Sequence, residues 1–152
     1  MFQITLQIIL TFLLLGFCLW ICLVDFRERR IPDLASLPLI CVGLVLSGYA
    51  TQVALADRLI GTGAGFLLFW AIGEAYFRVR SYEALGLGDA KIFAAAGAWL
   101  GWSYLSEVLL FASLSGLLFA TVRPKFSKVD LAFGPWLAAG FILSWFHLLF
   151  VL

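Results

Sequence analysis

The segment Gly86-Leu87-Gly88-Asp89-Ala90-Lys91 lies between two strongly apolar stretches of the chain and decides how the rest is interpreted. A carboxylate at membrane depth is costly to remove from water, so an ionisable residue there is a functional hypothesis by default. A second carboxylate, Asp25, directly follows the first apolar stretch. Two carboxylates at the same membrane depth suggest acid–base hydrolysis.

The composition around this segment is that of a membrane protein. Of the 152 residues, 64% are hydrophobic and only 12% are charged, and the mean hydropathy is +1.07. Soluble domains carry about 25% charged residues, so these few charges could not cover a water-facing surface. We therefore expect an all-α, polytopic protein with about six spans of about 20 residues. Such spans use nearly the whole length, which predicts a single transmembrane domain over residues 1–152.

The apolar stretches predict where these spans begin and end. The first is too long for a signal peptide and has no basic segment before it, so we expect a retained helix. Pro32 suits the first turn of the second span, and Pro38 is expected to kink that span. Small residues at Gly61, Gly63 and Gly65 would let the third span approach a neighbour closely. The expected spans cover residues 4–24, 34–50, 59–77, 89–100, 104–122 and 134–152.

The basic residues predict the orientation. If six spans alternate, every Lys and Arg except Arg58 lies on one side of the membrane. The positive-inside rule places that side in the cytoplasm and both termini outside. Asp25 and Asp89 then share the cytoplasmic side. The basic loops could also bind anionic lipids, although orientation alone explains them. The nine basic residues are Arg27, Arg29, Arg30, Arg78, Arg80, Lys91, Arg123, Lys125 and Lys128.

A pair of close carboxylates can hydrolyse a peptide bond if one is ionised and the other protonated. In a poorly hydrated site, repulsion between two like charges keeps one carboxyl protonated while the other is ionised. The two apparent pKa values then describe the pair rather than either residue. Asp25 would lie at the C-terminal end of a helix, where the helix dipole favours its protonated form, the acid. Asp89 would lie at the N-terminal end of a helix beside Lys91, and both favour its ionised form, the base. Arg27 and its basic neighbours act against this assignment, which therefore stays open.

The glycines before Asp89 have two explanations. Gly86 and Gly88 carry no side chain, so the backbone of an extended substrate could come close to Asp89. Alternatively, Gly-x-Gly-Asp is simply how a loop ends with Asp89 as the N-cap of a helix.

Three motifs give the chain a resemblance to a known family. Gly86-Leu87-Gly88-Asp89-Ala90-Lys91 resembles the Gly-x-Gly-Asp-x-Lys motif of the type IV prepilin peptidases, which are membrane aspartyl proteases. Asp25 followed by Ile31-Pro32-Asp33 resembles that family's first motif, with Asp33 in place of the commoner Asn. Phe133-Gly134-Pro135 resembles the segment that opens its last helix. The three occur in family order.

The resemblance implies a function and a site. Prepilin-like precursors would be cleaved at the cytoplasmic membrane face, after a Gly that ends a short basic leader, without metal or other cofactor and without nucleic acid. Asp25 and Asp89 would be catalytic. Larger family members also methylate the new N-terminus through a region with paired cysteines, and since this sequence shows no such region we do not expect that activity. The residues expected to shape the site are Pro32, Asp33, Gly86, Gly88, Lys91, Gly134 and Pro135.

Two other functions fit the same acids less well. A small proton-coupled transporter would place its acids nearer mid-span and show matching broken helices in two halves. A presenilin-like protease would carry a Pro-Ala-Leu segment late in the chain, and none occurs. Neither the precise precursor nor the oligomeric state follows from the sequence.

The remaining polar and sulfur-containing residues are expected to be structural. Glu74 could pair with Arg78 at helical spacing or line the site. Glu107 and His147 are expected near the outer interface. Cys18, Cys22 and Cys41 are expected to be small buried side chains rather than metal ligands.

Overall fold

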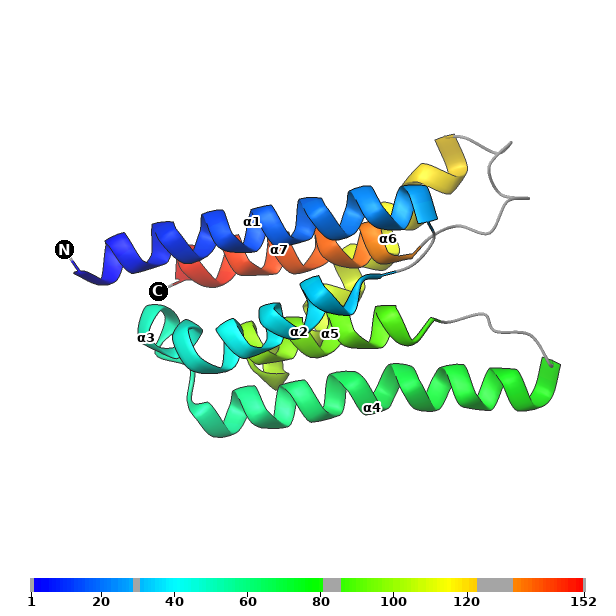
Figure 1. Cartoon of the computed structure of the whole chain (residues 1–152), viewed down its shortest axis with the longest axis horizontal. Coiled ribbons are helices and arrows are strands. Elements are labelled where there is room, and N and C mark those ends of the chain that lie inside the picture. The colour runs from blue at the N-terminus through cyan, green and yellow to red at the C-terminus, as the bar shows by residue number, and fades with distance from the viewer. Residues whose placement is uncertain (1, 29–30, 81–85, 123–132, 152) are drawn as a thin grey trace.

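The computed structural model describes residues 2–28, 31–80, 86–122 and 133–151, and these residues form helices joined by short connections, with no strand among them. Both chain ends lie at the same end of the bundle (Figure 1). The elements in chain order are α1 (Phe2–Glu28), α2 (Asp33–Val42), the π-helical segment η1 (Gly43–Ser47), α3 (Gly48–Thr51), α4 (Leu55–Arg80), α5 (Leu87–Leu100), the 3₁₀ turn η2 (Trp102–Tyr104), α6 (Leu105–Val122) and α7 (Gly134–Val151).

Within the described ranges, five helical segments are long and apolar enough to cross a membrane. They confirm an all-α polytopic membrane protein. The sixth expected span, residues 89–100, corresponds to α5, which has 14 residues and is therefore about 21 Å long. The five segments are Phe2–Glu28, Asp33–Thr51, Leu55–Val79, Trp102–Val122 and Gly134–Val151.

Helix α5 forms the buried centre of the bundle. Every residue from Ile92 to Leu100 is buried. Small side chains allow α4 to pack directly on it, since a Cβ added to Gly61 would lie 2.8 Å from the carbonyl oxygen of Gly97. One added to Gly65 would lie 2.8 Å from the carbonyl oxygen of Phe93. The expected close approach holds for these two glycines, whereas Gly63 has no atom within 4 Å and faces away.

The second span contains an irregular segment that the sequence did not predict. Helix α2 continues through Pro38 to Val42, and the irregular turn is η1. A Cβ on Gly43 would collide with the ring of Trp99, whose Nε1 donates to the carbonyl oxygen of Leu39 at 2.8 Å. The Ser47 hydroxyl donates to the carbonyl oxygen of Gly43 at 2.6 Å. The change from α-helix to π-helix at η1 thus occurs where α5 packs closely against this span.

Arg58 completes this irregular segment. It was expected to be a lone charge on the outer side, but the residue is only 7% exposed. Its Nη1 donates to the carbonyl oxygen of Leu44 at 2.7 Å and to that of Gly43 at 3.3 Å. A π-helical turn disturbs the regular hydrogen-bond ladder, and the guanidinium supplies donors to its carbonyl groups. Arg58 is therefore part of the helix packing.

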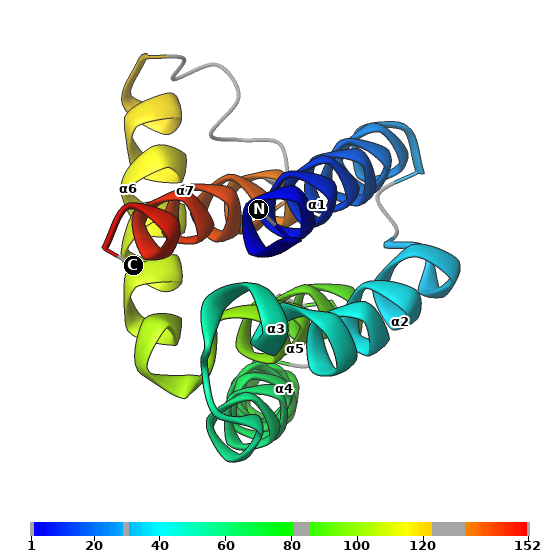
Figure 2. The ribbon, with the colours of Figure 1, turned by 90° about the vertical axis from the view of Figure 1, so that its left-hand side faces the viewer.

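The helices form two layers with α6 crossing beside them. Figure 2 shows α1 beside α7 in one layer and α2, α5 and α4 in the other, with α6 steeply inclined against α7. Trp145 joins α7 to both layers: its Nε1 donates to the Thr11 hydroxyl at 2.9 Å, and its ring meets the Trp99 ring edge-on at 5.2 Å. This arrangement brings the end of α1 and the starts of α5 and α7 to one end of the bundle (Figure 1).

Candidate active site

Asp25 ends the inward-facing stripe of α1. The buried residues of this helix are Leu10, Leu14, Cys18, Ile21 and Asp25, at steps of three or four residues, so they share one face. The sequence predicted that this helix would end at residue 24, but it continues to Glu28. The Asp25 carboxylate is therefore carried inside the bundle, where the residue is 6% exposed.

Asp89 is the third residue of α5 and is 8% exposed. The N-cap position belongs to Gly86, whose carbonyl oxygen accepts from the Asp89 backbone N–H at 3.1 Å. The alternative that Asp89 caps the helix is therefore wrong. Instead, its side chain projects into the bundle from the first turn, where the helix dipole favours a negative charge.

The two carboxylates lie close enough for their charges to interact. Asp25 also lies against the start of α7, since a Cβ added to Gly134 would be 2.6 Å from Asp25 Oδ2. That oxygen makes no hydrogen bond to any described part of the chain. A buried carboxylate with an unsatisfied oxygen is costly, and a catalytic role is one reason for a protein to retain such a group. The site is thus built where α1, α5 and α7 converge.

The start of α7 alters the acid–base argument. Asp25 ends α1, but its carboxylate lies at the first residue of α7, where the second helix dipole favours the charged form. The two dipoles act in opposite directions on Asp25, so which carboxyl is the acid stays open. Pro135, the second residue of α7, fits the first turn because its missing N–H would have no helical partner there.

Ile31 fills the space beside Gly88. A Cβ added to Gly88 would lie 2.6 Å from Ile31 Cβ, and one added to Gly134 would lie 3.3 Å from Ile31 Cδ1. The expectation that Gly88 leaves room for a substrate backbone is therefore wrong in this structure, because a side chain of the protein occupies that room. Gly86 does remain open, with no atom closer than 3.8 Å to an added Cβ. Sequence reasoning used Ile31 only as motif spacing and missed its packing role.

Lys91 has a different partner from the one expected. Its ammonium group forms an ion pair with the Asp33 carboxylate, so it links α5 to the first residue of α2 rather than sitting on Asp89. Pro32 is the N-cap residue of α2, one position before the helix, and its carbonyl oxygen accepts from the N–H of Ala35 at 3.0 Å. The ion pair joins the start of α2 to α5, two residues beyond Asp89.

The other polar candidates pair with residues other than the two aspartates. Glu107 and His147 are partners, with His147 Nδ1 at 2.9 Å from both carboxylate oxygens. Glu74 accepts from Arg78 Nε at 2.8 Å, as the helical spacing predicted. Cys18 is buried, but Cys41 is exposed, so the expectation that all three cysteines are buried is wrong. The expected basic residues Arg29, Arg30, Arg123, Lys125 and Lys128 lie outside the described residues.

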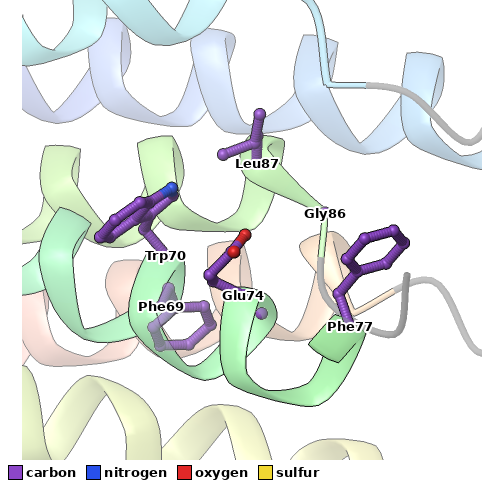
Figure 3. Close-up of a pocket in the computed structure, with 7 residues that line it drawn as sticks. Phe69, Trp70, Glu74, Phe77, Gly86 and Leu87 are labelled. Carbon is purple, nitrogen blue, oxygen red and sulfur yellow. The ribbon is translucent and has the colours of Figure 1, made fainter. Parts of the chain in front are cut away.

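Glu74 lines a cavity of about 360 Å³ between α4 and the start of α5. Figure 3 shows its carboxylate between the rings of Trp70 and Phe77, on the side of Leu87. The cavity adjoins the Gly-x-Gly-Asp segment through Gly86 and Leu87. Neither aspartate lines it, so it is separate from the carboxylate pair.

A helical membrane bundle with two buried, interacting carboxylates at one end defines the class: a polytopic protein with an aspartyl-type site. The model of the type IV leader peptidase family matches residues 12–121, and the chain belongs to that family. The match includes Asp25 and the Gly86–Lys91 segment; the Phe133-Gly134-Pro135 segment lies beyond it.

The curated relatives of this chain include proteins named prepilin leader peptidase/N-methyltransferase. The protein of Escherichia coli (strain K12) is 39% identical over 136 residues, which are 88% of this chain and 60% of the relative. That of Pectobacterium carotovorum is 41% identical over 84% of this chain and 47% of the relative. That of Dickeya chrysanthemi is 41% identical over 76% of this chain and 42% of the relative. The chain thus aligns with 42–60% of the length of these relatives. No solved structure matched the chain.

Proposed function

We propose that this protein is a membrane aspartyl endopeptidase that removes the short basic leader from prepilin-like precursors, using Asp25 and Asp89. The observation that carries the proposal is the burial of two interacting carboxylates from α1 and α5 at one end of the bundle. The family and the names of the relatives supply the substrate class. They do not favour the transporter alternative.

The chemistry follows from one proton shared between two carboxyl groups. The ionised aspartate takes a proton from water as the oxygen adds to the scissile carbonyl carbon, and the protonated aspartate gives its proton to the carbonyl oxygen. The tetrahedral diol then collapses. The C–N bond breaks, the leaving amine takes the first proton, and a diol hydroxyl returns the second to its aspartate. The pair ends as it began, so no cofactor is required.

The same proposal includes an orientation and a location. The end of the bundle that carries the aspartates faces the cytoplasm of a bacterial inner membrane, and both termini lie outside, as the positive-inside rule requires. Residues 1–152 form one transmembrane peptidase domain that is surrounded by lipid. Methyl transfer forms no part of the proposal.

The test is cleavage by the purified chain in liposomes. The substrate is a precursor with a basic leader, then Gly and an apolar segment of about 20 residues. We expect the parent to cleave after the Gly, and Asp25→Asn and Asp89→Asn each to insert normally and leave the precursor intact. An amide cannot supply the acid or the base, so full cleavage by either variant would refute the carboxylate pair.

A further inference from the structure

The cavity beside the Gly-x-Gly-Asp segment has the chemistry of a cation site. Three aromatic side chains of α4, those of Phe69, Trp70 and Phe77, line it, and among its described lining residues Glu74 supplies the carboxylate that projects between them (Figure 3). Aromatic faces attract ammonium and guanidinium groups, and a carboxylate adds a charge-assisted hydrogen bond. An anion would meet Glu74 and is disfavoured.

Arg78 does not close this site. It pairs with Glu74 Oε1 from the next turn of α4, and its side chain is 76% exposed. Exposed pairs of this kind contribute at most about 1 kcal/mol. An incoming cation can therefore share or replace Arg78 at the carboxylate with little loss. Trp70 and Phe77 are themselves about half exposed, so the aromatic walls are accessible.

The position of the cavity indicates which cation reaches it. Gly86 and Leu87 form its wall on α5, and Asp89 lies two residues further on. Gly86 presents no side chain, so an extended polypeptide can pass over it toward Asp89. The cavity also lies at the charged end of α4, before Arg80, where the polar part of a membrane-inserted precursor would remain.

We infer that this cavity binds one lysine or arginine side chain of the precursor, on the leader side of the scissile bond. The inference rests on the proposed function and deepens it. The apolar segment after the cleavage site remains in the membrane, and the basic leader is the part of the precursor that meets Glu74. The cavity thereby sets the register of the leader relative to Asp89.

The test is a cycle of paired changes in enzyme and leader. Glu74→Gln should raise KM for the basic-leader precursor on the order of tenfold and leave kcat unchanged, the signature of lost binding. Each leader Lys or Arg is then replaced in turn by Gln. One replacement should raise KM for the parent and abolish the difference between parent and Glu74→Gln. Glu74→Lys should regain affinity for a precursor with Glu at that same position.

Two controls make the outcome specific. Glu107→Gln removes a carboxylate that also pairs with a basic side chain, at the far end of the bundle, and should keep the parent KM. Trp70→Leu should reproduce the selective loss, because it removes an aromatic wall. A KM increase of equal size for every leader variant would overturn the inference and show a structural role for Glu74.

Lipid amines are the other source of a cation. The assay is therefore repeated in liposomes with and without phosphatidylethanolamine. An effect of Glu74→Gln that depends on this lipid and not on the leader would overturn the inference in favour of a headgroup site. The proposed function fails separately, if the parent cleaves no precursor or if Asp89→Asn retains activity.

Discussion

At the scale of single residues, Gly134 determines where the Asp25 carboxylate can lie. An added Cβ would be 2.6 Å from Asp25 Oδ2 and 3.3 Å from Cγ. Gly134→Ala should therefore displace the carboxylate and reduce kcat for precursor cleavage by at least about tenfold, or about 1.4 kcal/mol of transition-state stabilisation. Single-turnover cleavage in liposomes measures this loss. Parent-like kcat would show that Asp25 does not need this position.

Gly88 supports the site in a different way. An added methyl would press on Ile31 Cβ, and such overpacking typically costs about 1–3 kcal/mol. We expect Gly88→Ala to lower the thermal unfolding temperature in detergent and to reduce cleavage by at least an order of magnitude. The matched control is Gly63→Ala, where nothing lies within 4 Å and neither quantity should fall. Loss of cleavage with unchanged stability would instead restore the expected role in substrate approach.

The residue scale also shows the reach of sequence reasoning. Asp25 and Asp89 stand out in the sequence as candidates because a carboxylate beside apolar stretches is conspicuous, and their catalytic role stays a prediction. The partners of Lys91 and the role of Gly88 could not be found from the sequence, because both depend on where α2 starts relative to α5. Ile31 is apolar and stands in a charged stretch, so nothing local distinguished it from a loop residue.

At the scale of the elements, helix bounds were predictable and irregular turns were not. The ends of α6 and the start of α7 agree with expectation because hydropathy and Pro135 mark them. The π-helical segment η1 packs against Trp99 and accepts hydrogen bonds from Arg58, and neither contact leaves a periodic pattern in the sequence.

The link between α4 and η1 predicts a stability effect. Arg58→Met keeps an apolar stem but removes the donors to the carbonyl oxygens of Leu44 and Gly43. Hydrogen bonds from charged groups contribute about 1.5–3 kcal/mol each, so the variant should unfold at a markedly lower temperature in detergent. Arg78→Gln, at an exposed position, is the control and should unfold like the parent. Equal unfolding temperatures for Arg58→Met and Arg78→Gln would show that η1 does not need the guanidinium group of Arg58.

At the scale of the whole molecule, the bundle surrounds a short central helix with longer ones. The described helices bring both termini to the end opposite Asp25 and Asp89, as an even number of passes requires (Figure 1). That arrangement fixes which segments share a side, but a helical bundle has no direction in itself. Orientation depends on the basic loops, several of which fall outside the described residues.

Cysteine labelling in intact cells tests that orientation. In a background with Cys18, Cys22 and Cys41 replaced by alanine, a cysteine at Gln52 follows α3 at the end of the bundle away from the aspartates. A second, at Glu83, follows α4; it lies outside the described residues but within the basic side that the sequence predicts. Because positively charged segments are retained in the cytoplasm, a membrane-impermeant maleimide should label only the cysteine at residue 52. Permeabilised cells should label both. The reverse pattern would place Asp25 and Asp89 on the outer face, away from a cytoplasmic leader, and would refute the proposed substrate while leaving the carboxylate pair intact.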